Sequence, residues 1–286
     1  MKLAPYFLFV CVVNAAIAAP PKEIWTVTSG LSNPESSYYD AESQAIYVSN
    51  VAGEATKKDG VGWISKVSLD GKMIAEKWVE GLNAPKGIRV HKGKLWVSDI
   101  DTIVGIDMKT AKITDKVQIS AAKFLNDVEI GDDGTVYVSD MADPNIYMLQ
   151  GNNTQVFLSG EDLQSPNGLI LHDGKLVVGG WGIGMKPDFS VKKKGGLYSV
   201  DLKTKNISKL SGALGNLDGL EYEKDQRWLV SDWIRGDVFR YDAKTKKKTM
   251  LLKKLKGAAD IGYIAEKRML LVPEMNVSKL HAYELK

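Results

Sequence analysis

The sequence predicts an all-β fold, a six-bladed β-propeller with four-stranded blades. The main observation is a unit that recurs six times at intervals of about 40 to 50 residues, which is the period of propeller blades. Within each unit, turn residues separate two short β-rich segments, and further β-rich runs follow. No long helical periodicity accompanies the units. Four strands in each of six units define such a propeller.

Each unit starts with a short polar site and leads to a second strand that ends in a small residue, usually followed by Asp, Asn or Glu. The copies cover residues 34–50, 84–99, 125–140, 165–180, 216–232 and 259–274. The last copy has only three strands, whereas residues 23–28 form a β-rich segment ahead of the first copy. We therefore expect residues 23–28 to complete the last blade as its outer strand and close the ring, which removes an exposed edge.

The N-terminal segment has the pattern of an export signal. Lys2 precedes an apolar run over residues 3–19, and a small-x-small site ends at Ala18. The run is too short and wrongly flanked for a membrane span. The sequence therefore predicts a cleaved signal peptide at residues 1–18, a single propeller domain at 19–286, and a periplasmic or secreted location.

Composition excludes several classes of site and partner. The only cysteine, Cys11, lies in the predicted signal, so the processed chain has no disulfide and no thiolate metal ligand. The net charge is +3, and the lysine runs at 192–194, 246–248 and 253–256 fall in predicted turns or at strand edges. Lysine there is ordinary edge protection, and no nucleic-acid motif accompanies the runs. We expect no nucleic-acid partner and a monomer.

A polar residue begins the first strand of every copy. These residues are Glu35, Lys86, Asn126, Asn167, Asp218 and Asp260. The first strand of a blade lies beside the central channel, so the six side chains should face one axis. Buried charges without partners are costly. The alternative is that each residue only stabilises a turn, but their coincidence at one repeat position favours a shared ligand.

The donor types in this ring predict a calcium ion in the channel. Every member except Lys86 offers an oxygen atom, and Ca²⁺ takes several carboxylate and carboxamide oxygens in irregular geometry. Other divalent cations stay possible. The ring has no histidine or cysteine, which argues against zinc and copper.

The loops after the second strands should overhang the same mouth of the channel, because each second strand runs antiparallel to the first. Trp181 and Trp233 lie in these loops and either form apolar pocket walls or pack between blades. Glu274 lies in the last of the loops. The three histidines are predicted at the surface, in hairpin turns or an outer strand: His91, His172 and His281.

The repeat and its polar set resemble the senescence marker protein / gluconolactonase / luciferin-regenerating enzyme (SGL) family. The resemblance runs along the whole processed chain and is carried by residues 33–35, 125–127, 165–169 and 217–220, the last two segments most specifically. Diisopropyl fluorophosphatases and paraoxonases are similar in architecture. The resemblance implies direct calcium ligation by four of the ring residues: Glu35, Asn126, Asn167 and Asp218.

The family hydrolyses lactones and related esters, so the resemblance also implies that Asp218 acts as general base on water or as nucleophile. This sequence departs from the family pattern at Phe124, where gluconolactonases carry an arginine that holds a hydroxylated substrate. A more apolar ester or lactone is therefore expected. Lys86 should bind an anionic group or pair with Asp260. The predicted substrate pocket comprises Lys86, Phe124, Trp181, Trp233, Asp260 and Glu274.

These observations predict an exported, calcium-dependent hydrolase of lactone or ester type, gluconolactonase-like, that acts on a small molecule. The alternative is a non-catalytic exported propeller that binds a small molecule or a protein and holds a structural calcium, because fold alone does not determine function. The oxygen tetrad disfavours a metal-free propeller similar to strictosidine synthase.

Overall fold

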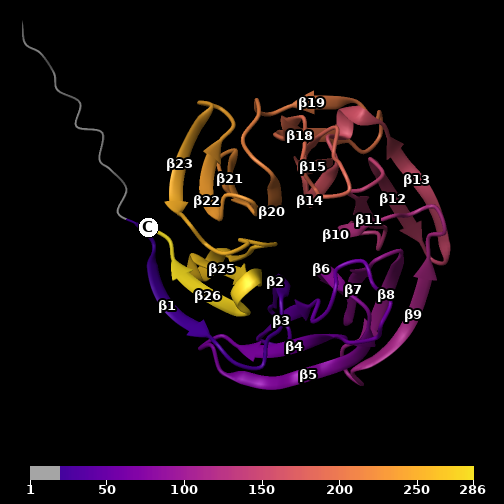
Figure 1. The fold of residues 1–286 in the computed structure, drawn as a ribbon, viewed down its shortest axis with the longest axis vertical. Coiled ribbons are helices and arrows are strands. Elements are labelled where there is room, and N and C mark those ends of the chain that lie inside the picture. Colours follow the sequence, from indigo (N-terminus) through magenta and orange to yellow (C-terminus); the bar gives the residue numbers. More distant parts are fainter. Residues whose placement is uncertain (1–19) are drawn as a thin grey trace, which may run out of the picture.

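The computed structural model describes residues 20–286, which form a ring of six four-stranded antiparallel sheets around a central channel (Figure 1). The predicted six-bladed propeller is confirmed. The predicted signal peptide at residues 1–18 lies outside the described residues. Among the residues that are described, no helix is both long and apolar enough to cross a membrane.

From the channel outward, blade 1 contains β2 (Pro34–Asp40), β3 (Ala45–Asn50), β4 (Gly62–Ser68) and β5 (Met73–Leu82). Blade 2 contains β6 (Pro85–His91), β7 (Lys94–Asp99), β8 (Thr102–Asp107) and β9 (Lys112–Gln118). Blade 3 contains β10 (Leu125–Ile130), β11 (Val136–Asp140), β12 (Asn145–Gln150) and β13 (Asn153–Ser159).

Blade 4 contains β14 (Pro166–His172), β15 (Lys175–Gly180), β18 (Leu197–Asp201) and β19 (Ile207–Lys209), and blade 5 contains β20 (Leu217–Lys224), β21 (Arg227–Asp232), β22 (Asp237–Asp242) and β23 (Lys247–Leu252). Blade 6 contains β24 (Gly262–Ile264), β25 (Met269–Glu274), β26 (Lys279–Glu284) and β1 (Lys22–Val27). Short 3₁₀ turns occur at Glu161–Leu163, Ala265–Lys267 and Met275–Val277.

The ring is closed by the N-terminal strand. β1 pairs antiparallel with β26 and so provides the outer strand of blade 6, as predicted (Figure 1). The hydrophobic core lies between neighbouring blades. One cluster, for example, joins Tyr47 and Ile64 of blade 1 to Ile88 and Val97 of blade 2, all of them buried. Side chains from facing sheets interdigitate in this way because each strand alternates between the two faces of its sheet.

A bulge at the start of the inner strands aims one side chain into the channel. In β2, Pro34 pairs with Asn50, and pairing resumes only at Ser37 with Val48. The same shift occurs in β6, β10, β14 and β20. The second residue of the strand is thereby released from the ladder. These second residues are Glu35, Lys86, Asn126, Asn167 and Asp218.

The small residue and the acidic residue that end the second strand stabilise this bulge through hydrogen bonds. Ser139 Oγ accepts a hydrogen bond from Asp127 N at 3.0 Å, and the Asp140 carboxylate accepts from Lys123 N and Phe124 N at 2.7 and 2.9 Å. Equivalent bonds join Ser231 Oγ to Gly219 N in blade 5. The repeat signature in the sequence is therefore the support of the channel-facing residues and not itself a ligand set.

The register of blade 6 corrects one prediction. Ala258 forms a bridge with Glu274, and β24 then begins with Gly262 opposite Leu271. Ala259 is therefore the second-position residue of blade 6, and Asp260 occupies the third position. The Asp260 side chain therefore does not point to the same side as the other ligand candidates, because consecutive residues of a strand point to opposite sides.

Candidate functional site

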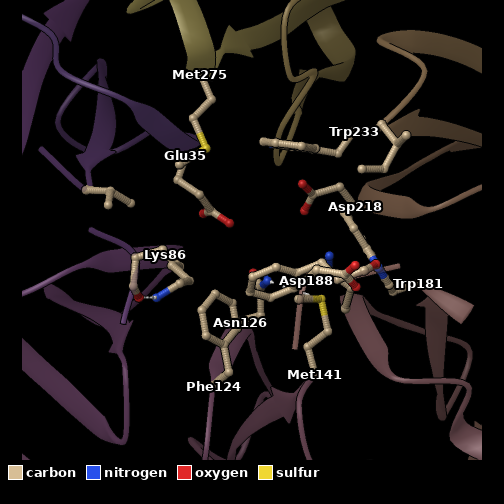
Figure 2. Close-up of a pocket in the computed structure, with 15 residues that line it drawn as sticks. Glu35, Lys86, Phe124, Asn126, Met141, Trp181, Asp188, Asp218, Trp233 and Met275 are labelled. Carbon is tan, nitrogen blue, oxygen red and sulfur yellow. Dashed lines mark hydrogen bonds between the residues drawn. The ribbon is translucent and has the colours of Figure 1, made fainter. Parts of the chain in front are cut away.

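The second residues of four inner strands meet in one cavity. Glu35, Asn126, Asn167 and Asp218 come from blades 1, 3, 4 and 5, and all line a space of about 300 Å³ at one mouth of the channel. Figure 2 shows the carboxyl groups of Glu35 and Asp218 pointing toward each other across this space, with Asn126 beside them. All four side chains are at most 5% exposed. The predicted set is thus brought to one place.

Several oxygen atoms of this set have no partner among the described residues. Glu35 Oε2, Asn167 Oδ1 and Asp218 Oδ1 are buried and make no hydrogen bond. The Asn126 side-chain amide nitrogen donates to the Met141 sulfur at 3.9 Å. Most buried polar atoms in proteins do have a hydrogen-bond partner. A group of orphaned acceptors around one cavity therefore fits a ligand that accepts their lone pairs.

Electrostatics point to a cation. Burial raises the pKa of Glu35 well above its usual value, and the negative charges of Asp218 and Asp260 add to the effect. Burial likewise raises the pKa of Asp218, together with the charges of Asp260 and Asp127. Two carboxylates that are this costly to ionise alone are stabilised when a cation lies between them.

The donor chemistry fits a hard divalent cation. Two carboxylates and two carboxamides offer only oxygen ligands, the preference of Ca²⁺. Within residues 20–286 no group of three or more His, Cys, Asp or Glu side chains is arranged to hold a metal. The carboxamide oxygens of the two asparagines, together with the two carboxylates, make up the set of oxygen ligands.

Lys86 lines the same cavity but does not pair with Asp260. Its ammonium group donates to Ala84 O at 2.9 Å and to Ala55 O at 3.3 Å, and it lies 4.4 Å from the centre of the Phe124 ring. Burial lowers the pKa of Lys86 to about 8, although the Glu35 charge opposes the change. Asp260 instead accepts from Ser36 Oγ at 2.5 Å. One donor of Lys86 stays available to a bound molecule.

The walls of the cavity are apolar and aromatic. The ring centres of Trp181 and Trp233 lie 6.2 Å apart, and both side chains line the space, so they form pocket walls (Figure 2). Phe124 lies edge-on to Phe189 at 5.5 Å. The remaining apolar lining includes Met141 and Met275. The result is a polar floor under hydrophobic walls, which is typical of small-molecule sites.

Sequence reasoning missed the segment that covers one side of this cavity. Between β15 and β18 the chain forms an extra hairpin of β16 (Gly182–Ile183) and β17 (Lys193–Lys194). Its loop brings Asp188 and Phe189 to the cavity, and Trp181 Nε1 donates to Phe189 O at 2.9 Å. The signal was present in the long interval between the second and third strands of this copy.

Two predicted pocket residues do not line the cavity. Asp260 lies deeper in the channel, where it faces Arg89 Nη1 at 3.8 Å. Glu274 accepts from Lys256 N at 2.6 Å and contacts His281 Nε2 at 3.0 Å. His281 is buried at 7% exposure and not at the surface as predicted, because β1 covers the strand that carries it.

The fold and the site together define a six-bladed β-propeller with an oxygen-lined cavity at the channel mouth. No model of a known protein family and no curated protein sequence matches the chain. Solved structures do match. A gluconolactonase of Xanthomonas campestris has a TM-score of 0.68 at 14% identity, with 94% of this chain and 95% of that chain covered.

Two further structures are similar. A streptogramin B lyase has a TM-score of 0.60 at 13% identity, with 93% of this chain and 97% of that one covered. A chain of a nidogen/laminin complex has a TM-score of 0.60 at 15% identity, with 75% and 78% covered. At such identities the likeness establishes the shared propeller fold alone.

Proposed function

We propose that this protein is an exported, calcium-dependent hydrolase of lactone or ester type, related to the gluconolactonase-like propellers of the SGL family. The observation that carries the proposal is the convergence of Glu35, Asn126, Asn167 and Asp218 from four blades on one cavity, with unpartnered oxygen atoms on three of them. The gluconolactonase of similar fold makes this class of reaction a reasonable comparison.

The four side chains would hold the cation, and the remaining cavity would hold the substrate. A bound divalent cation supplies polarisation of a substrate carbonyl and stabilises the negative charge that develops on its oxygen. Trp181, Trp233 and Phe124 surround the rest of the molecule and exclude water from it. These walls favour an apolar lactone or ester over a sugar lactone, since position 124 offers no guanidinium to hydroxyl groups.

Asp218 is the proposed catalytic residue. It lines the cavity and its Oδ1 atom has no partner. In one route this carboxylate accepts a proton from the attacking water, and in the other it attacks the carbonyl carbon itself. Lys86 can donate one hydrogen bond to an oxygen or anionic group of the substrate. In both routes one water is consumed and the C–O bond breaks, so that an ester gives an acid and an alcohol and a lactone gives one hydroxy acid. In the second route the alcohol leaves first, and water then releases the acyl group from Asp218.

The first prediction tests this role with the Asp218→Asn variant. The substitution keeps the shape and one oxygen but removes the base, so hydrolysis should fall by at least about 100-fold. Activity is measured on a panel of lactones, aryl esters and phosphotriesters, with chelator and after calcium is restored. Asp188→Asn is the matched control, because Asp188 lines the same cavity but hydrogen-bonds to Ser190.

Normal turnover by Asp218→Asn would exclude the assigned role. Calcium-dependent melting without hydrolysis on any substrate of the panel would favour the alternative, a non-catalytic propeller with a structural calcium. Export is tested separately. N-terminal sequencing of protein recovered outside the cytoplasm should begin at residue 19 if the predicted signal is cleaved after Ala18.

A further inference from the structure

A second cavity lies at the opposite mouth of the channel. It has a volume of about 260 Å³ and is lined by Tyr38, Tyr39, Arg89, Glu129, Ile170, Glu221, Gly262 and Tyr263. Five of these are the fifth residues of the inner strands β2, β6, β10, β14 and β20. The fifth position lies about 10 Å along the strand from the second. The two cavities therefore occupy different levels of one channel.

The only cation of this lining is already neutralised. Arg89 Nε lies 3.2 Å from Glu129, Nη2 lies 3.6 Å from Asp127, and Nη1 lies 3.8 Å from Asp260. Two backbone carbonyl oxygens, those of Ile88 and Leu169, accept its remaining bonds. Three carboxyl groups thus surround one guanidinium, and no direct ion pair with Glu221 is formed. The charge of Arg89 acts on Glu221 only from a greater distance, where it opposes but does not offset the effect of burial on the Glu221 pKa.

Glu221 is the acidic residue of this lining that has no ion pair with Arg89. Within residues 20–286 its side chain forms no ion pair and no hydrogen bond, although it is more than half buried and lines the cavity. Its neighbours are Arg89, Glu129, Asp127 and Asp260. Among these residues no cationic group lies within ion-pair distance of an ionised Glu221, and a bound cation would supply one.

The walls indicate which kind of cation fits. Three tyrosines line the space, Tyr38, Tyr39 and Tyr263, and the Arg89 guanidinium already lies 5.7 Å from the centre of the Tyr38 ring. Aromatic rings attract organic ammonium ions in the same way. A bare metal ion would find one free carboxylate here, too few oxygen ligands for Ca²⁺. The volume also exceeds what a single ion fills. We propose that this cavity binds a small organic ammonium ion, with Glu221 as its counter-ion and the tyrosine rings as its walls.

The proposal is tested with choline as the probe. Calorimetric titration at pH 9, where Glu221 is ionised, should show choline binding to the full chain in calcium. The uncharged isostere 3,3-dimethylbutan-1-ol has nearly the same shape, and we expect it to bind at least about tenfold more weakly. Neither measurement uses hydrolysis as its readout, so the result is independent of the proposed activity.

Variants locate the site. Glu221→Gln should weaken choline binding at least about tenfold, and Tyr263→Leu should weaken it several-fold. Asp188→Asn removes a carboxylate at the other mouth and should leave the affinity unchanged. The proposal is overturned if choline does not bind, if the isostere binds equally well, if Glu221→Gln binds choline normally, or if Ca²⁺ competes with choline for the site.

Discussion

At the scale of single residues, acidic side chains without a hydrogen bond or ion pair within residues 20–286 lie at both mouths of the channel. At one mouth Glu35 and Asp218 have unpartnered oxygen atoms in a cavity, and at the other the Glu221 side chain forms no hydrogen bond or ion pair with any residue of the described part of the chain. Between them, Arg89 is surrounded by Asp127, Glu129 and Asp260. Removing one member of such a network is costly because it leaves its partner buried and uncompensated. The unpartnered groups are the ones that a ligand can use.

The Glu221 carboxyl group gives a pH-dependent stability. Burial raises its pKa from 4.5 to about 8, so between these pH values the folded protein holds a proton that the unfolded chain has released. The contribution of Glu221 to the free energy of unfolding therefore falls as pH rises from about 4.5 to about 8. Glu221→Gln has no carboxyl group at this position and does not lose this stability. We predict that the variant gains on the order of 4 kcal/mol relative to the parent chain between pH 5 and pH 9, because each pH unit over which the folded protein retains the proton is worth about 1.4 kcal/mol.

Urea unfolding of the variant and the parent chain at the two pH values measures this difference, since every other titratable group is present in both proteins. Glu80→Gln serves as the control, because the Glu80 side chain is exposed and forms a surface ion pair with Lys77. An equal pH dependence of Glu221→Gln and the parent chain would show that this carboxyl group ionises normally in the folded state.

At the scale of elements, the site depends on how closely the inner strands approach one another. Third-position residues point toward the neighbouring blade, and several are glycines. A Cβ atom on Gly168 would lie 2.1 Å from Asp218 O, and one on Gly219 would lie 2.2 Å from Ile261 N. The small residues in Pro-Asn-Gly and Leu-Asp-Gly therefore let the strands that carry Asn167 and Asp218 lie side by side.

Gly168→Ala tests this packing. The added methyl group collides with backbone of the next inner strand, which cannot move as a flexible side chain can, so the free energy of unfolding should fall by about 1 to 3 kcal/mol. Calcium affinity should fall with it, because Asn167 and Asp218 separate. Gly212→Ala is the control, since nothing lies within 4 Å of its Cβ position. A Gly168→Ala protein with parental stability and affinity would exclude a tight approach.

At the scale of the whole molecule, the repeat predicts the ring, its closure by β1 and one polar position shared by the inner strands, because these depend on a periodicity that one chain displays. The choice of Glu35, Asn126, Asn167 and Asp218 among the polar residues rests on the family resemblance. The register of blade 6 is not predictable at that resolution. Aligning the copies on their second strands leaves an uncertainty of one residue, and a one-residue shift moves Asp260 to the other side of its strand. Glu221 and Arg89 occupy the same fifth position in different blades, and only the folded ring brings Arg89 together with Asp127, Glu129 and Asp260.

The same geometry predicts that calcium stabilises the entire ring. Its four proposed ligands come from blades 1, 3, 4 and 5, so a ligated cation joins blades that are distant in the sequence, and it binds the folded state alone. At 100-fold excess over its dissociation constant it adds about 2.7 kcal/mol, which should raise the melting temperature by roughly 5 °C or more. Scanning calorimetry with chelator and with calcium measures the shift. Asp218→Asn should lose most of it and Asp188→Asn should keep it, whereas identical melting of the parent chain in both conditions would exclude calcium from the channel.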